Sequence, residues 1–453
     1  MARFLLGIMI AIQGLGGTNA AYSLHWNTAS NRVDARIPGV PLSKVLTRLA
    51  RQTGWEIRIE SGKDRTVLTE FSDLPPRDAL RALLGEFSFV LIPERNKPSR
   101  LLVYQSSADA ADTLVNPGDD EYTLEPGPIP NELIVRIKPG SKLQIDELAK
   151  KLGAKVVGRL EELGAYRLRF PTAEAAEAAL AALKARDDIA GVEHNQLLPP
   201  PNDTGTPLAN TKADFTLKPK VVGAKDMIVV GVIDTRVQTL PDKYESFILD
   251  RRSIAEGAPT TDSTPTHGTV MAENILQGVA MADQSNQGST VRVLSEDIYG
   301  KDSMASTWSV ALGIYDAAAH GATYFSLSLG GKQDSPALDS VIASVKAQGG
   351  IVLAAAGNDG GTDPIYPAAG GALGVTAVTP QGQPASYANT GPQAVLAGPS
   401  MTYADYNGLV WQATGTSGAT AILSGLMAGH AAAFNLTPAQ SSSWLLQTAG
   451  FHH

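Results

Sequence analysis

The chain contains no cysteine, and that absence removes several kinds of chemistry at once. Without thiols the protein has no disulfide, no thiolate metal site, no cysteine nucleophile and no lipid-modified N-terminal cysteine. The absence does not place the protein in the cytosol, because exported bacterial proteins can also manage without disulfides.

Clusters of basic residues and long apolar segments are also missing. The chain has 45 Asp and Glu residues against 37 Lys and Arg residues, and no Lys/Arg block stands out, so a nucleic-acid-binding surface is not expected. No segment beyond residue 21 approaches the ~20 apolar residues of a transmembrane helix, so we expect no membrane span in the mature protein. A hydrophobic content of 43% in 453 residues is instead typical of several folded domains.

The first 21 residues have the pattern of a secretory signal peptide. Arg3 precedes an apolar run from Phe4 to Ile12, which is followed by small residues up to Ala20 and Ala21. The apolar run is too short to cross a bilayer, and we expect cleavage after Ala20 or Ala21. A buried first strand or helix is the alternative, because only one positive charge precedes the run.

Residues 33–105 alternate between helix and strand patterns, as in a small α+β domain. Apolar positions 42, 45, 46 and 49 form one helix stripe, Gly54 ends the helix, and a strand follows at 55–59; a second helix and strand are expected at 72–84 and 87–92, and a last strand at 101–104. The motifs PLSKVLTRLARQTG and ALRALLGEFSF resemble the short N-terminal domain of secretins and TonB-dependent receptors. The resemblance implies a periplasmic module that contacts an envelope protein. A generic small α+β domain is the alternative.

A second small domain is expected at residues 131–200, after an acidic linker at 106–130 that is rich in Pro, Gly and Ser. Strands at 132–137, 165–170 and 189–195 and helices at 143–152 and 173–185 predict a split βαβ fold. The motifs NELIVRIKPG and GVEHNQ resemble the first and last strands of a subtilase propeptide. Such a propeptide helps its enzyme to fold and then inhibits it.

The last domain is expected to span residues 208–453, after a boundary rich in proline. Near-continuous apolar runs at 227–233 and 351–356 alternate with helical patterns at 308–320 and 338–348. Strands that are apolar on both faces are typical of a parallel sheet covered by helices on both sides. The sequence therefore predicts an α/β domain with a doubly wound parallel sheet, preceded by two small α+β domains.

Four short segments of this domain carry the groups that peptide hydrolysis needs. Hydrolysis by a serine requires an imidazole base, a carboxylate that orients it, and hydrogen-bond donors for the oxyanion. The segments are Val232-Ile233-Asp234-Thr235, His267-Gly268-Thr269, Ala356-Gly357-Asn358 and Gly415-Thr416-Ser417. Their order of Asp, His, Asn and Ser is the order found in subtilases. The domain thus resembles a subtilase, which implies a subtilisin-like fold and a serine endopeptidase.

The resemblance also implies a role for each residue. Ser417 would be the nucleophile, His267 the general base, Asp234 the orienting acid, and Asn358 an oxyanion donor together with the backbone N–H of Ser417. A peptide substrate would add as a strand along the cleft. The implied substrate-binding residues are Ser328, Leu329 and Gly330 on one side, Gly300 on the other, and Ala356 and Gly357 beside Asn358.

Further expectations concern maturation and cofactors. The resemblance implies a precursor that cuts itself between Leu197 and Pro207. The catalytic chemistry requires no cofactor, and no histidine has a partner at metal-ligand spacing. Structural calcium is common in subtilases, but its scattered oxygen ligands are not located by the sequence.

Some positions depart from the subtilase pattern. Arg236 replaces the usual glycine two residues after Asp234, Glu273 replaces a glycine in the His267 helix, and Gly418 replaces the methionine after Ser417. An ion pair with Arg236 would turn Asp234 away from His267. The alternative to a protease is therefore an inert, subtilase-fold periplasmic protein that binds or signals through residues 33–105. Either protein would lie in the periplasm or envelope of a Gram-negative bacterium, or be secreted.

Overall fold

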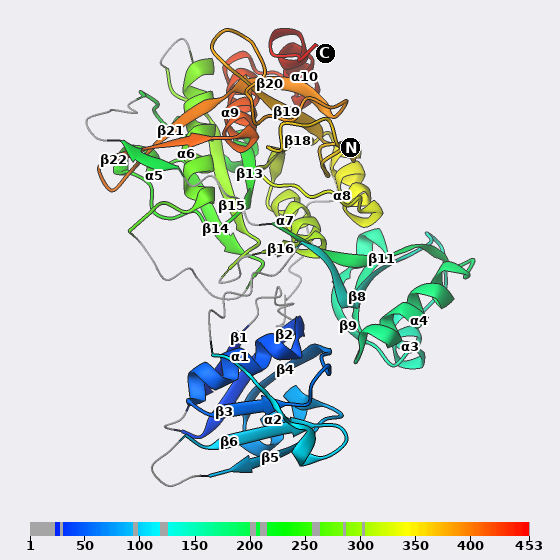
Figure 1. Cartoon of the computed structure of the whole chain (residues 1–453). Coiled ribbons are helices and arrows are strands. Elements are labelled where there is room, and N and C mark those ends of the chain that lie inside the picture. The colour runs from blue at the N-terminus through cyan, green and yellow to red at the C-terminus, as the bar shows by residue number, and fades with distance from the viewer. Residues whose placement is uncertain are drawn as a thin grey trace.

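The computed structural model arranges the chain in three units (Figure 1). In that view the N-terminal module lies below the C-terminal domain, and a middle domain (residues 127–198) lies to one side. The expected signal peptide, residues 1–21, lies outside the described residues. The structure describes residues 23–27, 30–93, 98–117, 126–199, 205–208, 215–255, 263–283, 287–300 and 304–452.

The N-terminal module has two sheets and two helices. α1 (Leu42–Thr53) and α2 (Pro76–Leu84) lie where the apolar stripes predict them, and Gly54 ends α1 in the left-handed conformation. Strand pairing extends the module beyond 33–105 at both ends, to β1 and β7. One sheet has the order β1-β2-β4 (Ser23–Asn27, Arg32–Pro41, Thr66–Leu74), and the other has the order β5-β6-β3-β7 (Ser88–Ile92, Arg100–Tyr104, Glu56–Ile59, Thr113–Leu114).

The middle domain is one antiparallel sheet with two helices, α3 (Ile145–Lys151) and α4 (Ala173–Lys184), whose apolar faces share a core with it. Its own strands have the order β11-β8-β10-β9 (Ile189–Leu198, Gly127–Ile137, Ala165–Arg169, Lys155–Leu160). The sheet does not end there, because Leu197 and Leu198 of β11 pair with β16 (Ala305–Ser306) of the C-terminal domain. Hydrogen-bonded strands therefore run from one domain into the next.

The C-terminal domain contains a seven-stranded parallel sheet, as its apolar runs predict. Val230 and Val232 of β13 point into the core formed with α6 (His267–Ala282) and α9 (Thr416–Phe434). Their neighbours Val229 and Ile233 point into the core formed with α7 (Thr307–Ala319) and α8 (Pro336–Ala347), which confirms a doubly wound sheet. The strand order is β14-β15-β13-β17-β18-β19-β20 (Ile248–Ser253, Val291–Asp297, Ile228–Asp234, Ala322–Leu327, Ile351–Ala355, Leu373–Val378, Ala394–Pro399).

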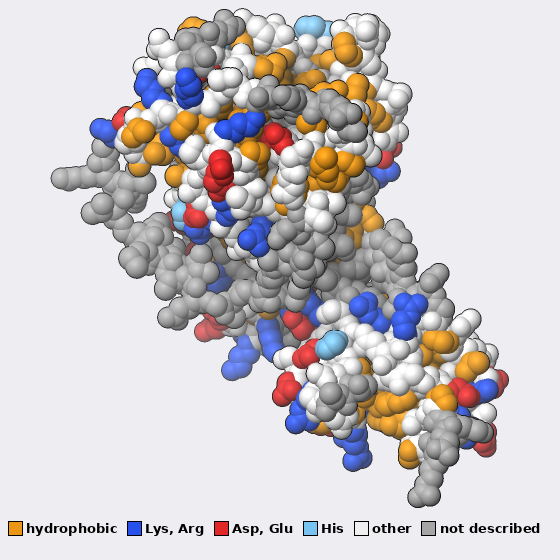
Figure 2. Space-filling view, turned by 90° about the vertical axis from the view of Figure 1, so that its left-hand side faces the viewer, with side chains coloured by type: hydrophobic (Ala, Val, Ile, Leu, Met, Phe, Trp, Pro, Cys, Tyr) orange, Lys and Arg blue, Asp and Glu red, His pale blue; other side chains and the backbone are white. Residues whose placement is uncertain are grey.

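Smaller elements complete this domain. β12 (Thr206–Leu208) pairs with the hairpin formed by β21 (Met401–Tyr406) and β22 (Leu409–Thr414), and α5 (Asp242–Glu245) and α10 (Pro438–Thr448) lie at the surface. None of the helices within the described residues has both the length and the hydrophobicity to cross a membrane. Apolar side chains are interspersed with charged ones on the face in Figure 2.

The helices α6 and α9 touch through their backbones. A Cβ atom at Gly425 would overlap the carbonyl oxygen of Ile275, and one at Gly429 would lie 2.9 Å from the Cα of Val279. Because both contacts advance by four residues on each helix, the two helices run parallel here. Ile275 is eight residues after His267 and Gly425 is eight residues after Ser417, so the first turns of α6 and α9 lie side by side.

The substitution Gly425→Ala should destabilise the C-terminal domain. The methyl group has no room against the α6 backbone, so the helices must separate at a cost of about 2–3 kcal/mol. Chemical denaturation measures this change. Gly361→Ala is the matched control, since the nearest atom to its added Cβ lies 4.0 Å away; equal stability of the two variants would contradict the close packing of α6 and α9.

Candidate active site

Asp234 and His267 form a buried pair at the carboxyl edge of the sheet. Asp234 is the last residue of β13 and His267 is the first residue of α6. The Nδ1 atom of His267 lies 2.8 and 2.9 Å from the two carboxylate oxygens, and each residue is only 1% exposed. The N–H of Thr235 also donates to the carboxylate, at 2.6 Å. These contacts fix the imidazole with Nδ1 toward the acid and Nε2 away from it.

Gly268 allows the two segments to approach. Its N–H donates to the hydroxyl of Thr235 at 2.8 Å, and a Cβ atom would overlap the carbonyl oxygen of Thr235. Thr266 is the N-cap of α6, and its hydroxyl accepts from the N–H of Thr269 and donates to the carbonyl of Arg236. The His-Gly-Thr motif thus ties the start of α6 to the end of β13.

Arg236 does not disturb this pair. Its side chain is exposed, and among the described residues the Asp234 carboxylate contacts His267 and Thr235 but forms no ion pair with Arg236. Arg236 instead acts on Asp297: burial raises the pKa of the Asp297 carboxyl, and the nearby guanidinium opposes that rise. The competing ion pair considered from the sequence is absent.

Ser417 lies in the first turn of α9, opposite Ser328, the residue that follows β17. The Ser417 hydroxyl donates to the Ser328 carbonyl at 3.3 Å, and the Ser328 hydroxyl donates to the Ser417 carbonyl at 3.0 Å. The backbone N–H of Ser417 is one of those at a helix start that have no acceptor within the helix. It is therefore available to a bound group.

Asn358 is held in a defined orientation beside Ser417. Its side-chain oxygen accepts from the N–H and the hydroxyl of Thr416, at 2.8 and 3.0 Å. Because the oxygen is engaged, the two N–H bonds of the amide point the other way. Asn358 and Ser417 line one cavity of about 710 Å³.

The cavity contains most of the predicted substrate-binding residues. Ser328, Leu329, Gly330 and Gly357 line it, whereas Ala356 is fully buried behind the wall. Gly300 does not line it either. The strand β15 ends at Asp297, and the chain turns before it reaches β16. In this turn the N–H of Gly300 donates to the Asp297 carboxylate at 2.8 Å. The strand that the structure places opposite Ser328–Gly330 is β16 (Ala305–Ser306), and residues 301–303 lie outside the described residues.

The end of the middle domain enters the same cavity. Leu197, Leu198 and Pro199 line it together with Ser417, and Leu198 pairs with Ala305. A Cβ atom at Gly331 would lie 2.7 Å from the Leu198 side chain, so the opposite wall is also in contact. The end of β11 thus lies between the two walls, as an added strand would.

Two polar residues of β11 cap helices of the C-terminal domain. Asn195 accepts from the Thr307 hydroxyl and the Trp308 N–H, both at 3.0 Å, at the start of α7. Glu193 accepts from the Ser335 hydroxyl and from the Ala337 N–H, at 2.5 and 3.2 Å, at the start of α8. Burial raises the pKa of Glu193. No local sequence pattern indicates these caps, because the helices they serve lie more than 100 residues away.

Glu273 is an internal residue rather than part of the site. It is fully buried in α6 and accepts from the N–H of Asp405 at 2.8 Å. Burial raises the pKa of its carboxyl to about 8. This departure from the subtilase pattern therefore affects the packing between α6 and β21.

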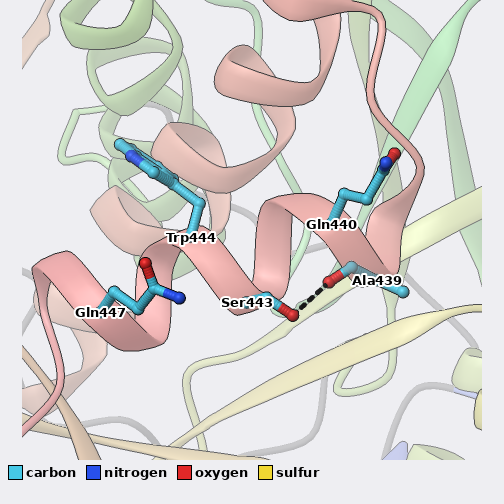
Figure 3. A pocket seen from close by; sticks show the side chains of 5 residues that line it. All are labelled: Ala439, Gln440, Ser443, Trp444 and Gln447. Carbon is cyan, nitrogen blue, oxygen red and sulfur yellow. Dashed lines mark hydrogen bonds between the residues drawn. The ribbon is translucent and has the colours of Figure 1, made fainter.

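A second, shallower hollow lies on α10 (Figure 3). It is lined by Ala439, Gln440, Ser443, Trp444 and Gln447, and the Ser443 hydroxyl donates to the carbonyl of Ala439 at 3.0 Å. It contains no carboxylate or imidazole and offers no acid or base. Over the part of the chain that the structure describes, no group of three or more His, Asp or Glu residues is placed to hold a metal ion.

Fold and site together define a class: a doubly wound α/β domain with a buried Asp–His pair, a serine at a helix start and an attached domain in its cleft. The profile of the subtilase family matches residues 225–453, and that of the fervidolysin N-terminal prodomain matches residues 123–195. The chain belongs to the subtilase family and carries a prodomain-like middle domain.

Several relatives are proteases by name. Halolysin of Haloferax mediterranei is 29% identical over 349 residues, which are 72% of this chain and 66% of the halolysin, just under two thirds of its length. Thermitase of Thermoactinomyces vulgaris is 30% identical over 207 residues, 44% of this chain and 72% of thermitase. The crystal structure of fervidolysin from Fervidobacterium pennivorans, described as a keratinolytic enzyme related to subtilisin, superposes with a TM-score of 0.53 over 70% of this chain and 57% of that one. Its 19% identity supports the fold alone.

The contact between β11 and α8 should depend on pH through Asp339. Burial and the neighbouring Asp334 and Glu193 raise the pKa of the Asp339 carboxyl to about 6. A raised carboxyl pKa in the folded chain means that ionisation costs stability once the pH passes the unfolded value. Asp339→Asn should therefore raise the melting temperature at pH 7.5 by about 2 °C, since Asp339 is partly exposed, with a smaller gain at pH 4.5.

Differential scanning calorimetry at the two pH values measures this change. Asp363→Asn, at an exposed carboxylate, serves as the control and should give no such pH-dependent gain. A gain for Asp339→Asn that is equal at both pH values would contradict the assignment.

Proposed function

We propose that the protein is a serine endopeptidase that is exported and made as a self-processing precursor. Ser417 is the nucleophile, His267 the general base, Asp234 the orienting acid, and Asn358 an oxyanion donor. The observation that carries the proposal is one cavity in which Ser417 and Asn358 face the end of the attached middle domain, with the Asp234–His267 pair buried where the end of β13 meets the start of the neighbouring helix α6. Relatives that are named as proteases, an alkaline protease of Shouchella clausii and an extracellular serine protease of Natrialba magadii, argue against the inert alternative.

The proposed reaction uses these four residues in turn. The Ser417 hydroxyl turns from the Ser328 carbonyl toward Nε2 of His267, gives up its proton, and its oxygen attacks the peptide carbonyl. Asp234 stabilises the imidazolium that forms. The oxyanion accepts hydrogen bonds from the Asn358 amide and the Ser417 N–H. His267 then protonates the leaving amine, and the N-terminal part of the peptide stays bound to the Ser417 oxygen as an ester. His267 next takes a proton from water, the water oxygen attacks the ester carbonyl, and the Ser417 oxygen leaves and takes the proton back from His267.

The middle domain acts as an inhibitor that is also the first substrate. On one side of the cleft, Leu198 pairs with Ala305. Further along the chain, Thr206 pairs with Gln412 of β22, the strand that precedes Ser417 in the sequence. The seven residues from 199 to 205 connect these two anchors. Prolines at 199, 200 and 201 have no N–H to offer the cleft walls and make poor strand residues, so cleavage falls after them.

The N-terminal module indicates where in the cell the protein would act. Its resemblance to the short N-terminal domain of secretins and TonB-dependent receptors suggests an envelope protein as its partner, and residues 1–21 suggest export to the periplasm or beyond. A peptide or protein is the substrate of the C-terminal domain. Structural calcium stays a prediction from the family.

Replacing Ser417 should abolish the activity and the processing together. The full-length protein should react with a fluorophosphonate probe and shorten by roughly 200 residues, and Ser417→Ala should do neither. Asn358→Ala should keep the labelled serine but lower kcat by ~10²–10³, the loss found for the oxyanion-hole asparagine of subtilisin itself. Asp363→Ala, at an exposed carboxylate that does not line the cavity, is the control. An unlabelled, unshortened wild-type chain would favour the inert alternative.

N-terminal sequencing of the shortened protein should place the cut after the prolines. We expect the new N-terminus between Asn202 and Thr206, since bonds to the nitrogen of proline lack the N–H that strand addition uses. A start at or before Pro201 would contradict the binding of this segment across Ser417.

A further inference from the structure

The N-terminal module is packed against the segment that enters the cleft. Its core is a contiguous cluster of buried apolar side chains that includes three residues from outside the module. They are Ile129 at the start of β8, Leu197 at the end of β11 and Met304 beside β16, and they are 4%, 6% and 2% exposed. These three residues flank the pairing of β11 with β16. The module therefore covers the strand that the middle domain adds to the C-terminal domain.

A chain of polar contacts joins the three units at the same place. Glu70 of β4 accepts from Nη1 of Arg169 at 2.7 Å, and Nε of Arg169 donates to Glu132 at 2.9 Å. The second oxygen of Glu132 accepts from Asn195 at 2.8 Å, and Asn195 in turn caps α7 at Trp308. Module, middle domain and C-terminal domain thus share one hydrogen-bonded path.

The centre of this path is well shielded from water. The side chain of Glu132 is 5% exposed and that of its neighbour Arg167 is 1% exposed, whereas Glu70 at the module end is 44% exposed. Burial alone would raise the pKa of Glu132, but Arg167 and Arg169 hold it below its usual value. The ionised Glu132 consequently depends on Arg169, whose other partner is the module.

We propose that the N-terminal module is a clasp that holds the middle domain in the cleft of the C-terminal domain. The inference rests on the proposed function, because it describes how the inhibitory segment is retained. By covering Leu197 and Met304 and by holding Arg169 toward Glu132, the module slows the departure of β11 from β16. Detaching the module is a step toward access to Ser417.

Reversing the charge of Glu70 tests the clasp. In Glu70→Lys the new ammonium faces Arg169 and Arg36, so the module should detach more easily. Glu56→Lys is the matched control: it makes the same charge change at a side chain of similar exposure, 40% against 44%, in an ion pair with Arg58 that stays within the module. The full-length Glu70→Lys protein should react with a fluorophosphonate probe about fivefold faster than Glu56→Lys, the change that a surface pair of about 1 kcal/mol allows. Equal rates would overturn the proposal.

A second measurement does not depend on catalysis. A recognition sequence for a site-specific protease is inserted in the 118–125 segment of the full-length Ser417→Ala protein, which is then cut there. The module should still co-elute with the rest of the chain in size-exclusion chromatography, and adding Glu70→Lys, but not Glu56→Lys, should release it. A module that leaves the cut protein without any substitution would overturn the clasp. Circular dichroism checks that each variant is folded.

The two measurements separate the two proposals. In one outcome, no variant reacts with the probe, but the cut module stays bound until Glu70 is changed. The proposed function then fails, whereas the contact between the module and the rest of the chain is supported. If the probe reacts in a Ser417-dependent way at the same rate in both charge reversals, the proposed function stands and the clasp fails.

Discussion

The contact between α6 and α9 is the constraint on which the site depends. Gly425 and Gly429 bring the two helix backbones together, and a side chain at either position would force them apart. His267 and Ser417 each precede this contact by the same number of residues along parallel helices, so the packing of glycine against backbone sets the spacing of two polar groups a few turns away. Protein interiors pass on such strain because they are close-packed. The chemistry at the sheet edge is therefore built on apolar packing beneath it.

The middle domain contacts the C-terminal domain through strand pairing and helix caps, the same interactions that hold a single domain together. β11 extends its sheet to β16, and Asn195 and Glu193 supply acceptors to the N–H groups at the starts of α7 and α8. A helix start that is buried without such acceptors is unfavourable. While the middle domain is bound, these donors are satisfied by protein. If the proposed processing releases the middle domain, water must take the place of these acceptors.

The sequence predicted the features that local pattern encodes. The apolar runs gave the parallel sheet, and the helix stripe and Gly54 gave α1 with its end. The subtilase order of Asp, His, Asn and Ser pointed to residues that the fold does bring to one edge. Contacts between distant segments were not predicted. The helix caps from Asn195 and Glu193 form only when the middle domain packs against the C-terminal domain. The strand beside β11 is Ala305–Ser306 and does not include Gly300, because the sequence between two strands does not show at which residue the second strand begins.

The polar path through Glu132 couples the three units in a way that apolar contact alone would not. Glu132 is ionised and buried, and it uses its two oxygens on Arg169 and Asn195. Removing one partner of a buried charge costs far more than an exposed ion pair contributes, because the remaining charge stays desolvated. Loss of the contact between Arg169 and the module, or between Asn195 and α7, therefore weakens what is left of the path. The units separate more easily together than one at a time, so detachment of the N-terminal module weakens the contact between the middle domain and the cleft.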